Sequence, residues 1–154
     1  MPALAQIRSA IVLKMNGIAN IGQVHDYERF AKREADFKAL FEWAGPPKQI
    51  RGWIVRRITK TERSEALGRV AVTNEWQIRG YMSFDDASAS EKTFDDLVEA
   101  IADAFRADEN LDGVVDSIVV DEVAAIQLED SGPVMFAGVL AHSARLRLLT
   151  RHYL

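Results

Sequence analysis

Hydrophobic and polar residues alternate with a period of two over residues 70–84, near the middle of the chain. Such alternation places successive side chains on opposite faces of a β-strand, so the pattern predicts a strand with one buried and one solvated face. Residues 50–60 are predicted to form the preceding strand, and the polar residues 61–68 to form the turn of a β-hairpin. The buried set in the second strand is Val70, Val72, Trp76, Ile78, Met82 and Phe84.

Helical spacing of apolar residues predicts three helices. The first begins near Pro2 and runs to about Met15, and the second runs from about Glu28 to Ala44, where Gly45-Pro46-Pro47 stops it. The third is predicted over residues 88–107, because Ser88-Ala89-Ser90-Glu91 has the spacing of a capping box. The apolar stripes are Leu4, Ile7, Ile11 and Met15 in the first helix, Phe30, Phe37, Leu40, Phe41 and Ala44 in the second, and Phe94, Leu97, Val98, Ile101 and Phe105 in the third.

Two more strands are predicted over residues 114–128 and 134–151, linked by the turn residues 129–132, and residues 24–27 are expected to be briefly extended. Residues 134–144 are apolar or small on both faces, apart from His142 and Ser143. A strand of this kind must be covered on both faces. The second layer would come from a loop, from curling of the sheet or from another subunit.

These elements predict an α+β fold in one domain, residues 1–154. We expect a mainly antiparallel sheet of four strands, or slightly more, with about three helices packed mostly on one face. The chain has 154 residues and no cysteine, which excludes disulfides and thiolate metal sites and suits a reducing compartment. The longest uncharged stretch, residues 131–144, is too short to span a membrane as a helix, and the amino terminus does not have the pattern of a signal peptide.

Charge is unevenly distributed along the chain. Residues 1–84 contain 14 Lys and Arg against 8 Asp and Glu, whereas residues 85–154 contain 5 against 15. One interpretation is that these charges only solvate the surface. The other is that the molecule has a basic and an acidic face, which would suit head-to-tail contact between identical subunits.

The candidate catalytic and metal-binding residues form weak patterns. Asp108-x-Asn110-x-Asp112-Gly113 matches the first half of a calcium-binding loop, but Val119 stands where the bidentate glutamate should be. A polar turn between a helix and a strand explains the same residues. The histidines are scattered, and adjacent residues such as His25-Asp26 or Asp121-Glu122 point to opposite faces of a strand, so they form no catalytic pair. No cofactor is predicted, and an enzymatic role is the least favoured.

A cluster of basic residues lies near Trp53 in the first predicted hairpin strand. Such clusters attract nucleic-acid phosphates, and an aromatic ring could stack on a base. The acidic pI of about 5.4 and the absence of a helix-turn-helix or RNA-binding signature oppose this hypothesis. Solvation, or pairing with acidic residues across strands, explains outward-facing arginines equally well. The cluster comprises Arg51, Arg56, Arg57, Lys60 and Arg63.

The order and length of these elements resemble the tail-terminator (tail-completion) proteins of long-tailed bacteriophages and prophages. The residues that carry the resemblance are Gly22-Gln23-Val24-His25-Asp26-Tyr27-Glu28-Arg29 before a helix, Ile50-Arg51-Gly52-Trp53 at the start of a long hairpin, and Ala141-His142-Ser143-Ala144-Arg145-Leu146-Arg147-Leu148 near the carboxyl end. The resemblance covers nearly the whole chain. Head–tail connectors and baseplate components would look similar, and a small nucleic-acid-binding accessory protein is the alternative from another class.

The resemblance implies a structural subunit that forms a ring, typically of six copies, on the last ring of the tail tube. Its partners would be further copies of itself, the tail tube protein and a head-completion (neck) protein, with no membrane and no sequence-specific nucleic acid. The protein would be located in the virion, at the head-proximal end of the tail, after assembly in the cytoplasm of the host bacterium. The candidate docking residues are Arg56, Arg57, Arg79, Arg145 and Arg147.

Overall fold

The structure is a computed structural model that describes residues 2–43 and 49–154. Its main feature is a sheet of six strands in which all pairs are antiparallel except β1 with β3. The strand order is β1-β3-β4-β8-β7, and β2 also pairs with β3. The predicted α+β class is therefore confirmed, with a sheet larger than four strands. The strands are β1 (Gln23–His25), β2 (Glu42–Trp43), β3 (Gln49–Ala66), β4 (Arg69–Ser83), β7 (Ile126–Phe136) and β8 (Val139–Tyr153).

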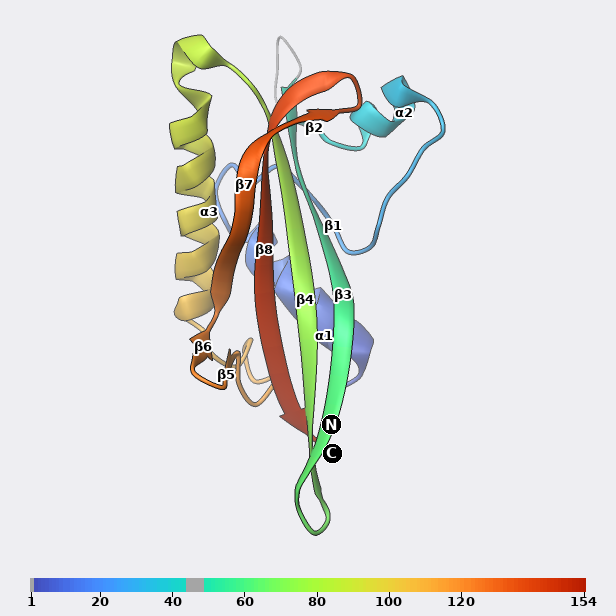
Figure 1. The fold of residues 1–154 in the computed structure, drawn as a ribbon, viewed down its shortest axis with the longest axis vertical. Coiled ribbons are helices and arrows are strands. Elements are labelled where there is room, and N and C mark those ends of the chain that lie inside the picture. Colours follow the sequence, from blue (N-terminus) through green and yellow to red (C-terminus); the bar gives the residue numbers. More distant parts are fainter. Residues whose placement is uncertain (1, 44–48) are drawn as a thin grey trace.

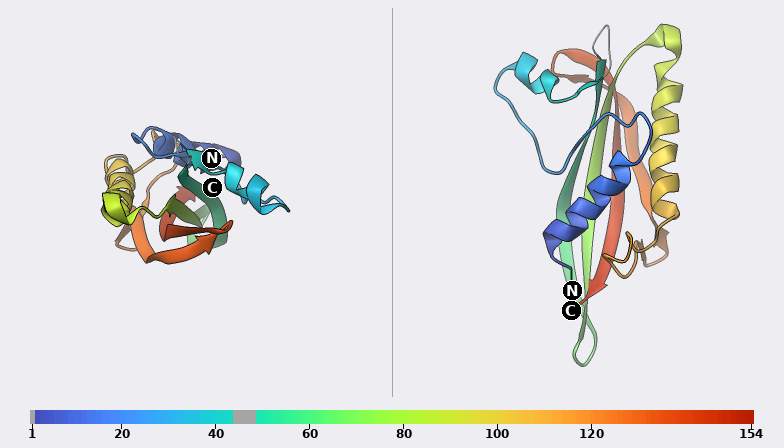
Figure 2. Two further views of the ribbon diagram at one scale, coloured as in Figure 1. Left: turned by 90° about the horizontal axis from the view of Figure 1, so that it is seen from above. Right: turned by 180° about the vertical axis from the view of Figure 1, so that it is seen from behind.

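Two helices, α1 (Leu4–Asn16) and α3 (Ser90–Arg106), lie on the same side of the sheet, as Figure 2 shows from behind. We call this side the helix face, and the opposite side the open face. The predicted apolar stripe of α3 is buried along its whole length, and the predicted alternation in β4 places Trp76 and Ile78 in the same core. Phe84, beyond the end of β4, is the exception, because 40% of its surface is exposed.

The third helix, α2 (Glu34–Ala39), is much shorter than the predicted helix 28–44. Residues 28–33 are not helical, so that part of the prediction is wrong, and Ala44 with Gly45-Pro46-Pro47 lies outside the described residues. In place of a helical turn, this segment lies over the sheet, where Glu28 forms ion pairs with Arg56 and Arg79. Phe37 and Phe41 still contribute to a core, but it is a second, smaller cluster on the open face.

This second cluster shows how the strand residues 134–144 are covered. Phe136 and Ala141 pack in it with Phe41, Ile50 and Ile54, and the ring centroids of Phe41 and Phe136 are 4.9 Å apart. The covering layer therefore comes from the α2 segment of the same chain, which was one of the three predicted sources. The cover is incomplete, because Met135 and Leu140, opposite each other on β7 and β8, are 69% and 47% exposed.

The two long hairpins turn later than the sequence suggested. β3 continues to Ala66, so most of the predicted turn 61–68 is strand, and the reversal occurs at Leu67-Gly68, where Gly68 has a positive φ of 75°. The predicted turn 129–132 lies inside β7, and the chain reverses at Ala137-Gly138 instead. Residues 114–125, predicted as strand, contain only a separate pair of two-residue strands, β5 (Val119–Val120) and β6 (Val123–Ala124).

The end of the β3–β4 hairpin extends beyond the rest of the sheet (Figure 1). The last β8 residue that pairs with β4 is Tyr153, opposite Ala71, so the residues 62–70 have no third strand beside them. Leu67 at the tip is fully exposed. We refer to residues 62–70 as the arm.

The predicted capping box at the start of α3 does not form. A short 3-10 turn occupies Asp86–Ser88, and Ala89, which precedes the helix, adopts a left-handed conformation with φ of 54°. The hydroxyl of Ser90 accepts a hydrogen bond from the Asp85 N–H at 2.9 Å. Ser90 therefore closes the turn before the helix, and the Ser88 side chain donates to the Asp85 carbonyl oxygen.

Candidate assembly surfaces

Four of the five predicted docking arginines lie on the open face, where the strand register brings them together. Arg79 on β4 is opposite Arg145 on β8, while Arg56 on β3 and Arg147 on β8 are both opposite Gln77 on β4. Two adjacent rows across three strands thus contain four guanidinium groups. The sequence analysis named these arginines, but the register that brings the four together comes from the structure.

Each of these arginines is paired with a carboxylate. Glu28 binds both Arg79 and Arg56, the latter at 3.7 Å. Arg145 pairs with Glu129 at 3.8 Å, and Arg147 with Glu75 at 3.4 Å. These ion pairs are partly exposed, so each is worth about 1 kcal/mol or less. Their larger effect is that three carboxylates offset most of the charge of these four arginines.

Arg57 does not belong to this group. It is opposite Trp76, so it projects from the helix face, and its guanidinium lies 3.4 Å from the Asn74 side-chain oxygen. A β-bulge follows it, between Arg57 and Thr59. One of the five predicted docking residues therefore lies on the opposite side of the sheet from the other four.

The structure does not support base stacking by Trp53. This indole is fully buried, stacks on Phe94 and donates from Nε1 to the Ile21 carbonyl oxygen at 2.8 Å. Arg51 is also buried: its guanidinium lies 3.9 Å above the Trp43 ring and donates to the Asn20 carbonyl oxygen, and burial lowers its pKa. Both residues serve the fold.

One long side of the molecule is basic. Beyond its pairs with β1 and β2, the outer edge of β3 has no strand partner within the described part of the chain. Four cations occur along this part of β3, with Arg56 and Arg63 projecting toward the open face and Arg57 and Lys60 toward the helix face. Glu62 is the one acidic residue between them, and it pairs with Lys60 at 2.6 Å. We call this set the basic flank: Arg56, Arg57, Lys60 and Arg63.

The other long side is acidic. The exposed surface of α3 presents carboxylates at every fourth position, which places them in one row along the helix. Among the described residues, only the last of them, Asp103, forms an ion pair, with Arg106 at 2.5 Å. Figure 1 shows α3 beside β7 at one side of the sheet and β3 at the other. We call this row the acidic flank: Glu91, Asp95, Glu99 and Asp103.

The partial calcium-loop motif forms a turn. Asp108 accepts hydrogen bonds from the Asp112 N–H and pairs with Lys14 at 2.7 Å, while the Asn110 side chain accepts from the Gly113 N–H. Burial acts to raise the pKa of Asp108, but the hydrogen bonds from Lys14 and Asp112 outweigh it, so the pKa is lowered. No group of three or more potential metal-ligating side chains occurs among residues 2–43 and 49–154.

The histidines have structural contacts. His25 Nε2 donates to the Leu40 carbonyl oxygen at 2.7 Å, which fixes the α2 segment to β1. His142 is buried, stacks on Phe84 and lies 2.7 Å from the Ser90 hydroxyl through Nε2. The sequence analysis missed this Ser90–His142 contact, because 52 residues separate the two and no local pattern connects them. Burial lowers the pKa of both His142 and His152.

An open groove of about 700 Å³ lies between α1 and the loop after α3. Its walls are mostly small or apolar, including Ala5, Ala10, Leu13 and Val114, and Lys14 and Asp112 are its only charged residues. No helix in the described residues is both long enough and apolar enough to cross a membrane. No protein-family model matches the chain, and no curated protein matches it in sequence.

Proposed function

We propose that this protein is a structural subunit of a bacteriophage tail terminator, which joins copies of itself side by side into a ring at the end of the tail tube. The observation that carries the proposal is that the two long sides of the molecule are unlike: one is the basic edge of β3 and the other the acidic surface of α3 (Figure 1). A contact between two different surfaces of identical subunits is heterologous, and it generates a ring when the rotation closes.

The shape supports the same proposal. β3, β4, β8, β7 and α3 all run along the long axis, so neighbouring copies would meet along their lengths (Figure 1). The arm and the two chain ends lie at one end of this axis, whereas α2 and the β7–β8 turn lie at the other. A ring of such subunits would have two different rims, one for the tail tube protein and one for a head-completion protein.

The phage context comes from the resemblance in the order and length of the elements. Six copies, a virion location and assembly in the host cytoplasm belong to the same proposal. The ion-paired arginines of the open face favour protein partners over nucleic acid, because a surface with paired charges gains little from phosphate contacts.

The experiment is to incubate the purified protein with elongating tail tubes of the same phage or prophage and to measure tube length by electron microscopy. The expected result is that tubes stop growing and carry one added ring at one end, while native mass spectrometry of the free protein detects ring-sized species at high concentration. Tubes that grow to the same lengths with and without the protein would contradict the proposal.

A further inference from the structure

We infer that the basic flank of one copy docks against the acidic flank of the next, so that the lateral contact is β3 edge to α3 surface. This inference rests on the proposed self-assembly and names the two surfaces that meet. The flanks lie on opposite sides of a single molecule, so they cannot satisfy each other within one chain (Figure 1). A second copy of this chain supplies the opposite charge for each of them.

The acidic charges are available for such a contact, and the basic ones are partly available, because Lys60 pairs with Glu62 and Arg56 with Glu28 in the free protein. In the acidic flank, Glu91, Asp95 and Glu99 form no ion pair within the described residues. In the basic flank, Arg63 likewise has none there, and Arg56 shares Glu28 with Arg79 at a distance of 3.7 Å. In the free protein these charges are exposed and screened by solvent. The attraction between opposite charges becomes stronger when a contact excludes the water between them.

The acidic row and the basic row have similar lengths, so one can lie along the other. Carboxylates at every fourth residue of a helix are about 6 Å apart, so the row from Glu91 to Asp103 is about 18 Å long. At about 3.3 Å per strand residue, Arg56 and Arg63 are about 23 Å apart. A strand edge with this many charged side chains is poorly suited to adding another strand, but it can lie against the outer surface of a helix.

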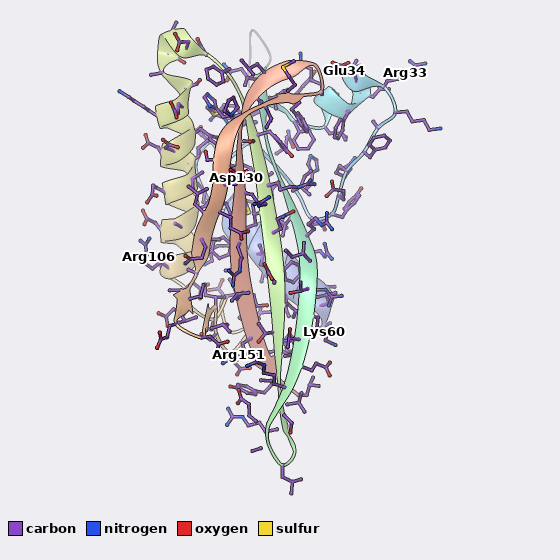
Figure 3. The ribbon with its side chains drawn as sticks, in the orientation of Figure 1. Arg33, Glu34, Lys60, Arg106, Asp130 and Arg151 are labelled. Atoms are coloured by element: carbon purple, nitrogen blue, oxygen red, sulfur yellow. The ribbon has the colours of Figure 1, made fainter. Side chains whose placement is uncertain are left out.

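The two rows are not level along the long axis. Figure 3 labels Arg106 at the carboxyl end of α3 and Lys60 on β3, and Arg106 lies nearer the α2 end of the molecule. The acidic flank precedes Arg106, so it lies closer still to that end. Neighbouring copies must therefore be shifted along their strands, which in a closed ring means that the strands are inclined to the ring axis.

Zero-length cross-linking tests the contact directly. A carbodiimide joins the Lys60 ammonium group to a carboxylate in van der Waals contact, forming an amide as the carbodiimide takes up the water that is lost. In a mixture of ¹⁴N- and ¹⁵N-labelled protein, mass spectrometry should find Lys60 joined to Glu91, Asp95, Glu99 or Asp103 with one light and one heavy peptide. The Lys60–Glu62 pair, at 2.6 Å in the same chain, is the internal positive control.

Charge-reversal variants provide a second test of the contact. Lys60→Glu with Arg63→Glu reverses two of the four charges of the basic flank, and Asp95→Lys with Glu99→Lys reverses two of the four charges of the acidic flank. Each variant alone should lose at least about tenfold in inter-copy cross-linking, measured with a neutral photoreactive reagent, because the changed flank loses its net charge and presents like charges at the two changed positions. An equimolar mixture of the two variants should recover it. The matched control, Lys32→Glu with Arg33→Glu, changes the charge equally on exposed residues outside both flanks and should behave like wild type.

The outcomes separate this inference from the proposed function. Inter-copy cross-links that never involve the two flanks, or a mixture that fails to recover what each variant lost, would overturn the flank contact and leave the ring intact. No inter-copy cross-link at any concentration, together with tail tubes that elongate unchanged, would overturn both.

Discussion

Gly80 lies where β4 passes beneath the indole of Trp53, at the centre of the helix-face core. A Cβ at this position would overlap the six-membered ring of Trp53, which is fully buried and fixed by its bond to Ile21. Gly132, on the edge strand β7, faces open space, and a Cβ there would meet nothing within 4 Å. The two glycines therefore form a natural matched pair.

We expect Gly80→Ala to lower the free energy of unfolding by about 1–3 kcal/mol, the usual cost of overpacking a core. Gly132→Ala should change it by less than about 0.5 kcal/mol, as is usual for surface substitutions. Urea denaturation of both variants beside wild type measures the difference. Equal stability of the two variants would show that Trp53 can move aside without cost.

Stability should fall as the pH is lowered below about 6.5, the ordinary pKa of histidine. Burial lowers the pKa of His142 and His152 in the folded protein, so the unfolded chain binds protons first and gains stability from them. The contribution is complete above pH 6.5 and is lost progressively as the pH falls toward the two folded pKa values. The free energy of unfolding, measured at pH 7.5 and at pH 5.5, gives the size of this loss.

The variant His142→Gln should lose less stability between these two pH values than wild type does, because glutamine does not titrate. Changing His152 to Gln as well should reduce the loss further. A pH dependence that is the same in the double variant and in wild type would assign the effect to carboxylates instead.

For single residues, the sequence predicted well which side of its strand a side chain occupies, but it predicted poorly which residue that side chain contacts. Alternation placed Arg79 on the polar side of its strand and Arg145 and Arg147 on the polar side of theirs, because the direction of a strand side chain depends on its position. It could not show that Glu28 would bind Arg56 and Arg79, because Glu28 lies in an irregular segment whose position depends on the whole fold.

Among the elements, the arm is the part of the sheet whose residues are exposed on both strands. Its strand pairs all belong to the β3–β4 ladder, residues 62–69 are exposed, and a bond from the Leu154 N–H to the Val70 carbonyl oxygen joins its base to the carboxyl end. A two-stranded hairpin without a third strand or a hydrophobic face is marginally stable by itself. The arm is therefore held mainly by its continuity with the longer β3–β4 ladder.

Hydrogen exchange should distinguish the arm from the rest of the same two strands. We expect the amides of residues 63–69 to exchange at least about 100-fold faster than those of residues 76–80, which pair with β3 and β8 and cover the core. Mass spectrometry of peptides from the two regions measures this ratio. Similar protection in both regions in the free protein would mean that another copy already covers the arm.

The contrast between elements that bury one side and the arm, which is solvated on both, also explains which elements could be predicted from the sequence. β4 and α3 each bury one side against a core, so their sequences alternate with the period of a strand or a helix. Residues 61–66 have two solvated faces, so they carry no alternation, and their polar composition was interpreted as a turn although they form strand. The capping box failed for a different reason, because Ser90 and His142 together close the turn before α3.

For the whole molecule, the open face combines a high density of arginine with paired carboxylates. Replacing Glu28, Glu75 and Glu129 by glutamine would remove the carboxylates that pair with Arg56, Arg79, Arg145 and Arg147. We expect this triple variant to bind heparin or DNA measurably, with an affinity that falls as salt concentration rises, while wild type binds weakly or not at all. Retention on heparin across a salt gradient is the measurement.

Exposed carboxylates outside the open face provide the control for this experiment. Glu65, Glu109 and Glu122 can be changed to glutamine together, which alters the net charge equally. If this control binds heparin as strongly as the triple variant, net charge accounts for the effect and the pairing on the open face does not.

The two chain ends leave the molecule beside each other at the base of the arm (Figure 1), where the Leu154 N–H donates to the Val70 carbonyl oxygen and Pro2 lines the same small hollow as Leu154. A bulky fusion at either end would therefore shield the same rim of an assembly and leave the sides of each subunit clear. A fluorescent protein attached there can distinguish stacking from lateral closure, because only stacking onto that rim would be blocked. A short peptide bridging the ends, with new ends opened at Ala137-Gly138, would move the obstruction to the opposite rim.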